Sequence, residues 1–407
     1  MDTNQKSGLI KLPYELLRAV FDDLESDSLL RLCLTSKSLY RFTLPELHRS
    51  VVIRTAKTES FKRLCENDPA MADSVESLTI HYHYESLPAE GLSPVIACMS
   101  GLRNLTVREQ IWRPTSGDVQ RKLGLQWLFQ QSMQSPNILG SLRSCELYLD
   151  DRWDLSARDA VFFHPQLRNL SIINAQMADF PTFDKSKERT TLLGNLTLVR
   201  CEFGPNVLNQ VLAVPKALQK LTFRGPPTLL LQQPPPVPQV QQHPLLTAIA
   251  QQADSLTMLN LFFCHPLLAE WYLPLNFRPL RALEELAITT YDLGDDVEIL
   301  PDQNPLPRSL KKLDIYNPLF FNGFDFSGLP IEKEFMEALG SWVSAGDLPN
   351  LALLILSVPS PVSAEVPGGF NDPLIPGTNV PVERRAWDEL QRLHFNCWCR
   401  DNNPYST

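Results

Sequence analysis

The chain has 407 residues, and 43% of them are hydrophobic, which is enough for a large core or for more than one domain. Its net charge of −9 and its pI near 5.4 argue against a nucleic-acid-binding protein, which needs clustered positive charge. No apolar run is as long as a membrane span, and the first ten residues lack the apolar core of a signal peptide. We therefore expect a protein of the cytoplasm or nucleus whose eight cysteines are reduced.

Residues 12–53 predict three short helices. Pro13 suits a first helical turn, and an apolar stripe follows at helical spacing, made of Leu16, Leu17, Val20, Phe21 and Leu24. Ser26 with Asp27, and later Thr35 with Ser36, are expected to cap two further helices, whose apolar positions are Leu29, Leu30, Leu32, Leu34, Leu39, Tyr40 and Phe42. Pro45 is expected to end the last helix. Three helices of this length form a small core, so this segment should share its apolar surface with a neighbour.

The same residues resemble an F-box. The family begins with Leu-Pro and an acidic-Leu-Leu run, continues with a Ser-Lys and a later aromatic residue, and closes with Pro-x-Leu; here these are Leu12, Pro13, Glu15, Leu16, Leu17, Ser36, Lys37, Tyr40, Pro45 and Leu47. The sequence departs from many members at Tyr40, where they have Trp, and at Ser28, where they have Leu. The alternative interpretation is a helical cap on whatever follows.

The resemblance implies a partner. F-box domains bind the Skp adaptor, which connects them to a cullin and so to a ubiquitin-conjugating enzyme. By this resemblance, the residues expected to contact the adaptor are Leu12, Pro13, Leu16, Leu17, Leu30, Leu34 and Pro45.

From residue 75 onward, one six-residue frame returns in eleven candidate units: apolar, two variable, apolar, one variable, apolar, as in Val75, Leu78 and Ile80. Its middle positions are Leu78, Leu105, Cys145, Leu170, Leu196, Leu221, Leu259, Leu286, Leu313, Leu354 and Leu393. Six of the intervals between them measure 25 to 27 residues. The pattern resembles leucine-rich repeats, in which each unit contributes one strand and buries its leucines against its neighbours.

We therefore expect an α/β protein, in which an N-terminal three-helix F-box precedes a leucine-rich-repeat solenoid with a curved parallel sheet and with helices and loops outside. The expected parts are the F-box at 8–53, a connecting segment at 54–74 and the repeats at 75–400, with insertions near 109–140, 225–250, 319–347 and 357–386. Amphipathic helices are expected around 123–133 and within 319–345. The proline- and glutamine-rich residues 225–244 read as a loop, or alternatively as a proline-motif docking site.

Strand alternation predicts which side chains of the repeats face a protein substrate on the concave side. The predicted substrate-binding residues are His81, His83, Arg108, Tyr148, Asp150, Arg224, Phe262, Tyr316 and His394. Acidic loops near 150–154 and 292–298 are open to two interpretations, namely docking of a basic partner segment or solvated turns.

The sequence contains no catalytic motif of the kinds that mark hydrolases, phosphate-binding loops or zinc proteases, so we expect no enzyme activity, no cofactor and no metal. His81 with His83, and Cys397 with Cys399, are the pairs that a metal would need, but a binding surface and isolated thiols are the simpler interpretations.

The resemblance as a whole implies a substrate-recognition subunit of a Skp–cullin–F-box ubiquitin ligase that binds the adaptor and an unidentified protein substrate, but neither nucleic acid nor membrane. The alternatives are a cullin-independent F-box scaffold and an enzyme with a site in a repeat loop.

Overall fold

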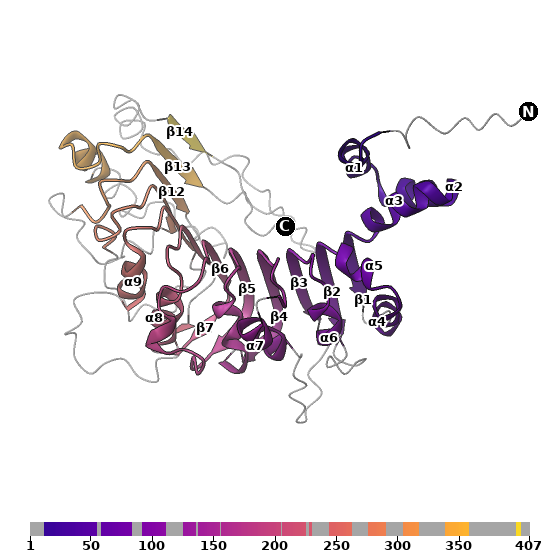
Figure 1. Ribbon diagram of the computed structural model, residues 1–407. Coiled ribbons are helices and arrows are strands. Elements are labelled where there is room, and N and C mark those ends of the chain that lie inside the picture. The colour runs from indigo at the N-terminus through magenta and orange to yellow at the C-terminus, as the bar shows by residue number, and fades with distance from the viewer. Residues whose placement is uncertain are drawn as a thin grey trace, which may run out of the picture. The chain divides into compact units, whose positions relative to one another are not determined.

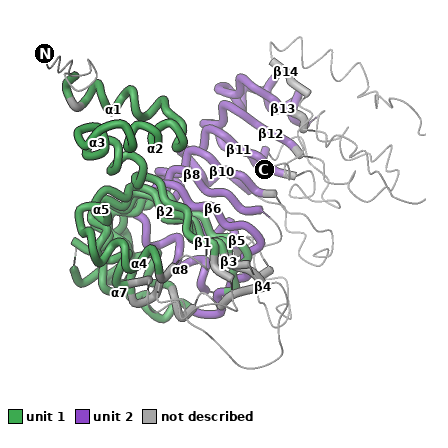
Figure 2. The backbone as a smooth tube through the Cα atoms, turned by 90° about the vertical axis from the view of Figure 1, so that its right-hand side faces the viewer, with its two compact units in different colours: residues 1–176, 180–193 green, residues 177–179, 194–407 purple. Residues whose placement is uncertain are grey.

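The computed structural model describes residues 12–54, 58–83, 92–110, 125–135, 137–154, 156–204, 206–224, 228–229, 244–262, 276–289, 304–316, 338–357 and 396–399. The chain divides into two compact units (Figure 2). The first unit comprises residues 1–176 and 180–193, and the second comprises residues 177–179 and 194–407.

The first unit begins with the three predicted helices, which are confirmed: α1 (Tyr14–Asp22), α2 (Ser26–Thr35) and α3 (Lys37–Leu47) (Figure 1). Leu17, Phe21 and Leu29 form their small buried core. Ser36 caps α3 as expected, because its side-chain oxygen accepts a hydrogen bond from the Leu39 N–H at 3.2 Å.

Two details of these helices differ from the prediction. Pro45 does not end α3, which continues to Leu47. The helix tolerates the proline because it lies in the last turn, where the His48 N–H still reaches the Leu44 carbonyl at 3.2 Å. Ser26 and Asp27 do not cap α2, since the residue before the helix is Glu25 and no side chain bonds to the free N–H groups there.

Five parallel strands of the first unit follow in chain order: β1 (Ser50–Arg54), β2 (Ser77–His83), β3 (Asn104–Gln110), β4 (Ser144–Asp154) and β5 (Asn169–Met177). Their register places the middle positions of the repeat frame opposite one another, in the row Val51, Leu78, Leu105, Cys145 and Leu170. The predicted parallel repeat sheet is therefore confirmed for these strands.

The array of strands begins earlier than the sequence frame suggested. Strand β1 pairs with β2, although its residues fall at the end of the expected F-box and the start of the expected connecting segment. Residues 58–74 of that segment contain two helices, α4 (Thr58–Asn67) and α5 (Pro69–Ser74). The frame failed at this unit because His48 occupies the position where the later units have an apolar residue.

Helices cover one face of these strands. Besides α4 and α5 they include α6 (Leu92–Ala97), α7 (Leu125–Gln134) and the 3-10 helices η4 (Ser156–Phe163) and η5 (Lys185–Lys187). Figure 1 shows α4, α6 and α7 along the same side of β1 to β4. Leu128 and Phe129 of α7 are fully buried, which confirms the amphipathic helix expected there. The strand residues that alternate with the buried ones face the other side.

The second unit repeats this arrangement with the parallel strands β6 (Asn195–Val199), β8 (Lys220–Arg224), β10 (Met258–Phe262), β11 (Glu285–Thr289), β12 (Lys312–Tyr316), β13 (Leu353–Ser357) and β14 (Asn396–Cys399). Two short strands, β7 (Glu202–Phe203) and β9 (Thr228–Leu229), also pair in parallel. The helical segments are α8 (Val207–Ala213), α9 (Pro244–Ile249), the 3-10 helix η6 (Ala250–Gln252) and residues 338–344. The last segment confirms the second expected helix and buries Trp342.

The last strand departs from the predicted frame. Cys397 pairs with Leu354, so the strand comes four residues after the position expected for Leu393. Asn174 within β5 and Arg200 directly after β6 each lie two residues past the last frame position and adopt a left-handed φ of 59° and 52°. Cys201, the residue after Arg200, is buried.

Among the described residues, no helix combines the length and the apolar composition that crossing a membrane requires.

A leucine of the repeat frame should contribute far more to the free energy of unfolding than its outward-facing neighbour. We expect Leu78→Ala to lower the free energy of unfolding by about 2–5 kcal/mol, because the fully buried side chain leaves a cavity between β1 and β3. Thr79→Ala, on the opposite face, should change it by no more than about 0.5 kcal/mol. Urea unfolding followed by circular dichroism measures both, and equal effects would contradict the assigned faces.

Candidate functional site

The most unusual surface of the described residues is an apolar one on the N-terminal helices α1, α2 and α3. Nine large hydrophobic side chains are exposed in the described part of the chain, and six of them lie between residues 12 and 40. These six are Leu12, Leu16, Val20, Leu30, Leu34 and Tyr40, with exposed fractions from 37% to 81%; we call them the outer apolar face. A soluble surface rarely concentrates so many apolar groups unless a partner covers them.

Helix geometry explains how this face arises. On α1, Leu17 and Phe21 are buried, while Leu16 and Val20 lie one residue earlier in each case and form a parallel exposed row. On α2, Leu29 and Cys33 are buried in the same way. Leu30 and Leu34 form the exposed row of that helix. Each helix therefore carries two apolar rows, but the three-helix core covers only one of them.

The residues predicted to bind the adaptor divide accordingly. Leu12, Pro13, Leu16, Leu30, Leu34 and Pro45 are exposed. Leu17 is not: it is 1% exposed and packs in the core with Phe21 and Leu29, which corrects its assignment to the surface. Val20 and Tyr40 are exposed and were missed as surface residues. The spacing of Val20, four residues after Leu16, was the available signal for that position.

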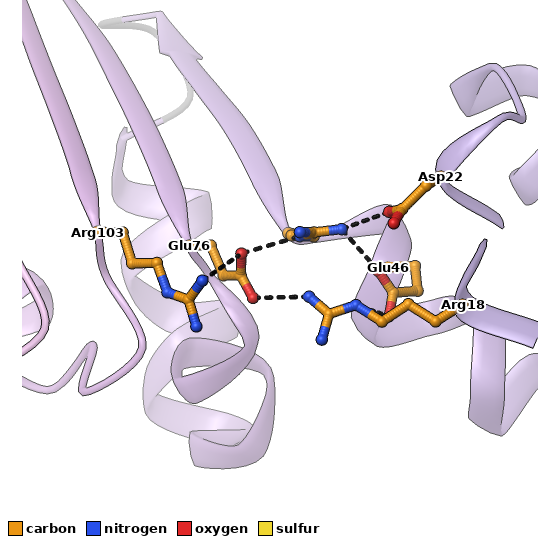
Figure 3. Close-up of polar contacts among 6 residues, drawn as sticks. Arg18, Asp22, Glu46, Glu76 and Arg103 are labelled. Carbon is orange, nitrogen blue, oxygen red and sulfur yellow. Dashed lines mark hydrogen bonds and ion pairs between the residues drawn. The ribbon is translucent and has the colours of Figure 1, made fainter. Parts of the chain in front are cut away.

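A second feature is the cluster of charges between these helices and the sheet (Figure 3). Glu76, which precedes β2, lies 3.0 Å from Arg18 Nη2 of α1 and 3.0 Å from Arg49 Nε, just before β1. Arg103, which precedes β3, contributes a third cation at 3.9 Å. We call these residues, with the two carboxylates described next, the junction cluster.

The other carboxylates of the junction cluster belong to the F-box helices. Arg49 also contacts Asp22 of α1, and its Nη1 lies 3.6 Å from Glu46 of α3. Glu46 in turn lies 3.8 Å from Arg18 Nε. The arginines thus connect α1 and α3 to the first strands.

The environment of Glu76 favours its charged form. Burial alone would raise the pKa of this carboxyl, but the hydrogen bond from Arg49 and the charges of Arg49, Arg103 and Arg18 outweigh it and hold the pKa below its ordinary value. Burial likewise opposes the charge on Arg49, yet the hydrogen bond to Glu76 and the neighbouring carboxylates raise the pKa of its guanidinium. Glu76 and Arg49 are therefore both charged at neutral pH.

The backbone at the same residues fixes the junction further. The N–H groups of Glu76 and Ser77 both donate to the Arg49 carbonyl at 2.9 Å, and those of Arg103 and Asn104 donate to the Glu76 carbonyl at 2.8 and 3.0 Å. Only His48 and Arg49 separate the end of α3 from the start of β1. The direction of the F-box helices is thereby tied to the direction of the first strands.

The outward face of the strands in the first unit is the third feature. The register places Arg54, His81, Arg108 and Tyr148 side by side on β1 to β4. The guanidinium carbon of Arg108 lies 4.7 Å from the centre of the Tyr148 ring, a cation–π contact. Burial and the neighbouring Glu146 raise the pKa of the Tyr148 hydroxyl, so it stays protonated.

The predicted substrate-binding residues are distributed over both units. His81, Arg108 and Tyr148 come together on the first, and Arg224 is exposed on β8 of the second. The side chains of His83, Asp150, Phe262 and Tyr316, and the whole of His394, lie outside the described residues. Arg54 was missed because strand β1 itself was not recognised.

A buried histidine beside α7, on the helix-covered side of the first unit, has a structural role. His164 packs edge-on against Phe129, and burial lowers its pKa to about 4, so the ring is neutral. Its Nδ1 accepts a hydrogen bond from the Gln166 N–H at 3.3 Å. The described residues contain no group of three or more His, Cys, Asp or Glu side chains placed to hold a metal ion.

The junction cluster makes stability depend on pH. Glu76→Gln removes the carboxylate that faces three arginines, and we expect it to lower the free energy of unfolding by about 1 kcal/mol at neutral pH. Since the folded-state pKa of Glu76 lies below its ordinary 4.5, its contribution is complete above pH 4.5 and disappears as the pH falls through the folded-state value.

The unfolding curves of the wild type and Glu76→Gln should therefore converge in acid. Glu66→Gln is the matched control, because Glu66 forms only a surface pair with Lys62 at 3.9 Å. A Glu76→Gln variant no less stable than this control at neutral pH would show that the junction cluster contributes nothing.

Comparison with known proteins agrees with the helical part of this description. The F-box-like family model matches residues 9–54. No relative was found among curated proteins.

Three solved structures are similar to the chain at low scores. They are an internalin from Listeria monocytogenes str. 4b F2365 (13% identity, TM-score 0.36, covering 96% of this chain and 94% of that one), a chain of the Rad7 and Elc1 complex in yeast (13%, 0.28, 88% and 90%) and a chain of the TLR13–ssRNA13 complex (13%, 0.29, 83% and 52%). These scores are too low to assign a fold or a function.

The strand register and the family match together identify the architecture: residues 9–54 are an F-box-like domain, and parallel strands of leucine-rich-repeat type follow it.

Proposed function

We propose that this protein is the substrate-recognition subunit of a Skp–cullin–F-box ubiquitin ligase. In this proposal the outer apolar face binds the Skp adaptor, and the repeats bind a protein substrate for ubiquitination. The observation that carries it is the concentration of exposed apolar side chains on α1, α2 and α3, within the residues that match the F-box-like family. A helical cap that binds no partner is not expected to leave a second row of apolar side chains exposed to solvent.

The energetics of the outer apolar face fit a stable complex. Burying one such side chain completely contributes ~1.5–3 kcal/mol, and those of Leu16 and Leu30 are about half exposed. Leu34, with 81% of its surface exposed, would bury the largest fraction of its surface against a partner. Covering the six residues together is enough to account for a large share of a specific affinity, with the exposed Pro13 and Pro45 at its margin.

The proposed role requires no chemistry from this chain. A receptor accelerates modification by holding its substrate near an enzyme, which raises the effective concentration of one for the other. That task needs a fixed direction between the adaptor-binding and substrate-binding surfaces. The junction cluster and the two-residue connection between α3 and β1 supply this for the first strands.

Co-purification tests the proposal. The full chain, expressed with the Skp adaptor, should elute with it as one complex, and Leu16→Asp or Leu34→Asp should abolish the complex by placing a charge at the contact. Leu192→Asp is the matched control, because Leu192 is also an exposed leucine, at 44%, but lies outside the F-box helices. A second step adds the cullin to the purified complex.

The outcomes separate the candidate functions. A complex lost only with the F-box variants, and able to recruit the cullin, supports the ligase receptor. An adaptor complex that never recruits the cullin leaves the scaffold interpretation. Soluble, folded protein that does not bind the adaptor refutes both candidate functions. Residues 9–54 would then be only a helical cap on the repeats.

A further inference from the structure

Basic side chains border the outer apolar face where α2 and α3 contribute to it. Arg31 of α2, and Lys37 and Arg41 of α3, are all exposed. We call these three residues the basic rim. The sequence contains no Asp or Glu from residue 28 to residue 45, whereas residues 15–27 contain five. The acidic and basic residues of this domain are therefore segregated along the chain.

Helical spacing places the basic rim directly beside exposed apolar residues. Arg31 lies three residues before Leu34 on α2, and Lys37 lies three residues before Tyr40 on α3, so each pair shares one helix face. Arg41 follows Lys37 by four residues and lies on the same side of α3. The basic rim therefore adjoins the outer apolar face on both helices.

The basic rim has no acidic partner within the structure. Among the residues that the structure describes, no ion pair involves Arg31, Lys37 or Arg41. Arg18 and Arg49, in contrast, both contact carboxylates of the junction cluster. Three unpaired cations within eleven residues are a local exception in a chain with a net charge of −9.

The position of the basic rim disfavours α3 itself. Lys37 is the first residue of α3, where the helix dipole favours acidic side chains, and the first turn of this helix contains none. Arg41 adds a second positive charge one turn later, and like charges at this spacing repel each other. The folded chain alone gains nothing from this arrangement, whereas an acidic partner would relieve both effects.

We propose that the basic rim binds acidic side chains of the Skp adaptor when the adaptor covers the outer apolar face. This inference rests on the proposed function and specifies the chemistry of the partner at one end of the contact. Arginine and lysine form charge-assisted hydrogen bonds with carboxylates. Such pairs at the margin of an interface speed association and select one orientation of the partner. The basic rim thus determines which end of the adaptor's surface meets α2 and α3.

An anionic membrane is the less favourable partner, although basic residues beside exposed leucines also occur in membrane-surface helices. The same domain exposes Glu15, Asp23, Glu25 and Asp27, and the chain as a whole is negative. Anionic headgroups would be repelled by these charges. A protein can instead place its acidic side chains only against the basic rim.

Association kinetics of the full chain with the purified Skp adaptor test this inference. We expect Arg31→Glu and Arg41→Glu each to lower the association rate constant by about tenfold, and its dependence on salt to become weaker. Arg168→Glu is the matched control, because it makes the same charge change at an exposed arginine outside these helices. Circular dichroism shows whether each variant retains its helices.

Cross-linking provides a second measurement that leaves the charge of the chain unchanged. A carbodiimide joins an amine directly to a carboxylate that it contacts, so mass spectrometry of the complex should find Lys37 Nζ joined to an Asp or Glu of the adaptor. Lys37→Arg should lose this cross-link and keep the adaptor bound, because arginine retains the positive charge.

The outcomes separate this inference from the proposed function. Unchanged association of both arginine variants, an equal effect of Arg168→Glu, or a formed complex without the Lys37 cross-link would each overturn the inference and leave the proposed function intact. A wild-type chain that forms no complex refutes the proposed function and the inference with it. Binding to phosphatidylserine vesicles that Arg41→Glu abolishes, without any effect of this variant on the adaptor, would assign the basic rim to a membrane instead.

Discussion

One carboxylate, Glu76, connects the helical module to the sheet. It receives hydrogen bonds from Arg18 of α1 and from Arg49 at the entrance to β1, while its backbone belongs to the row of hydrogen bonds that starts the strands. Because the residue is partly buried and faces three arginines, losing it would leave like charges together rather than merely remove a contact. The small F-box-like core of Leu17, Phe21 and Leu29 has little stability to spare, so this attachment also supports the helices themselves.

This attachment lets the two rows of apolar residues on α1 and α2 serve different purposes. The buried row forms the core, and the ion pairs of Arg18 and Arg49 with Glu76 connect the helices to the first strands. The outer row, including Leu16 and Leu34, therefore remains available to a partner. On the strands, the same alternation separates a leucine core from a polar face, so that binding residues can vary without disturbing the fold.

Much of this could be predicted from the sequence, because periodic burial leaves periodic patterns. The three helices, the capping Ser36 and most strands followed from spacing alone. Strand β1 was not predicted because His48 interrupts the apolar frame. Strand β14 was predicted four residues too early because an equally good leucine pattern lies there. The sequence also could not tell the exposed Leu16 from the buried Leu17. Adjacent leucines look alike in sequence, and only packing decides which one is buried. The junction cluster could not be foreseen, since its arginines and carboxylates come from segments up to 85 residues apart, from Arg18 to Arg103.

We propose that the outer apolar face of the F-box helices, and not the sheet, contacts the Skp adaptor. Hydrogen–deuterium exchange of the full chain with and without the adaptor tests it most directly. We expect slower exchange in peptides of α1 and α2, around Leu16 and Leu34, with strands β2 and β3 unchanged. Protection confined to the strands, or none in the helices despite a formed complex, would contradict it.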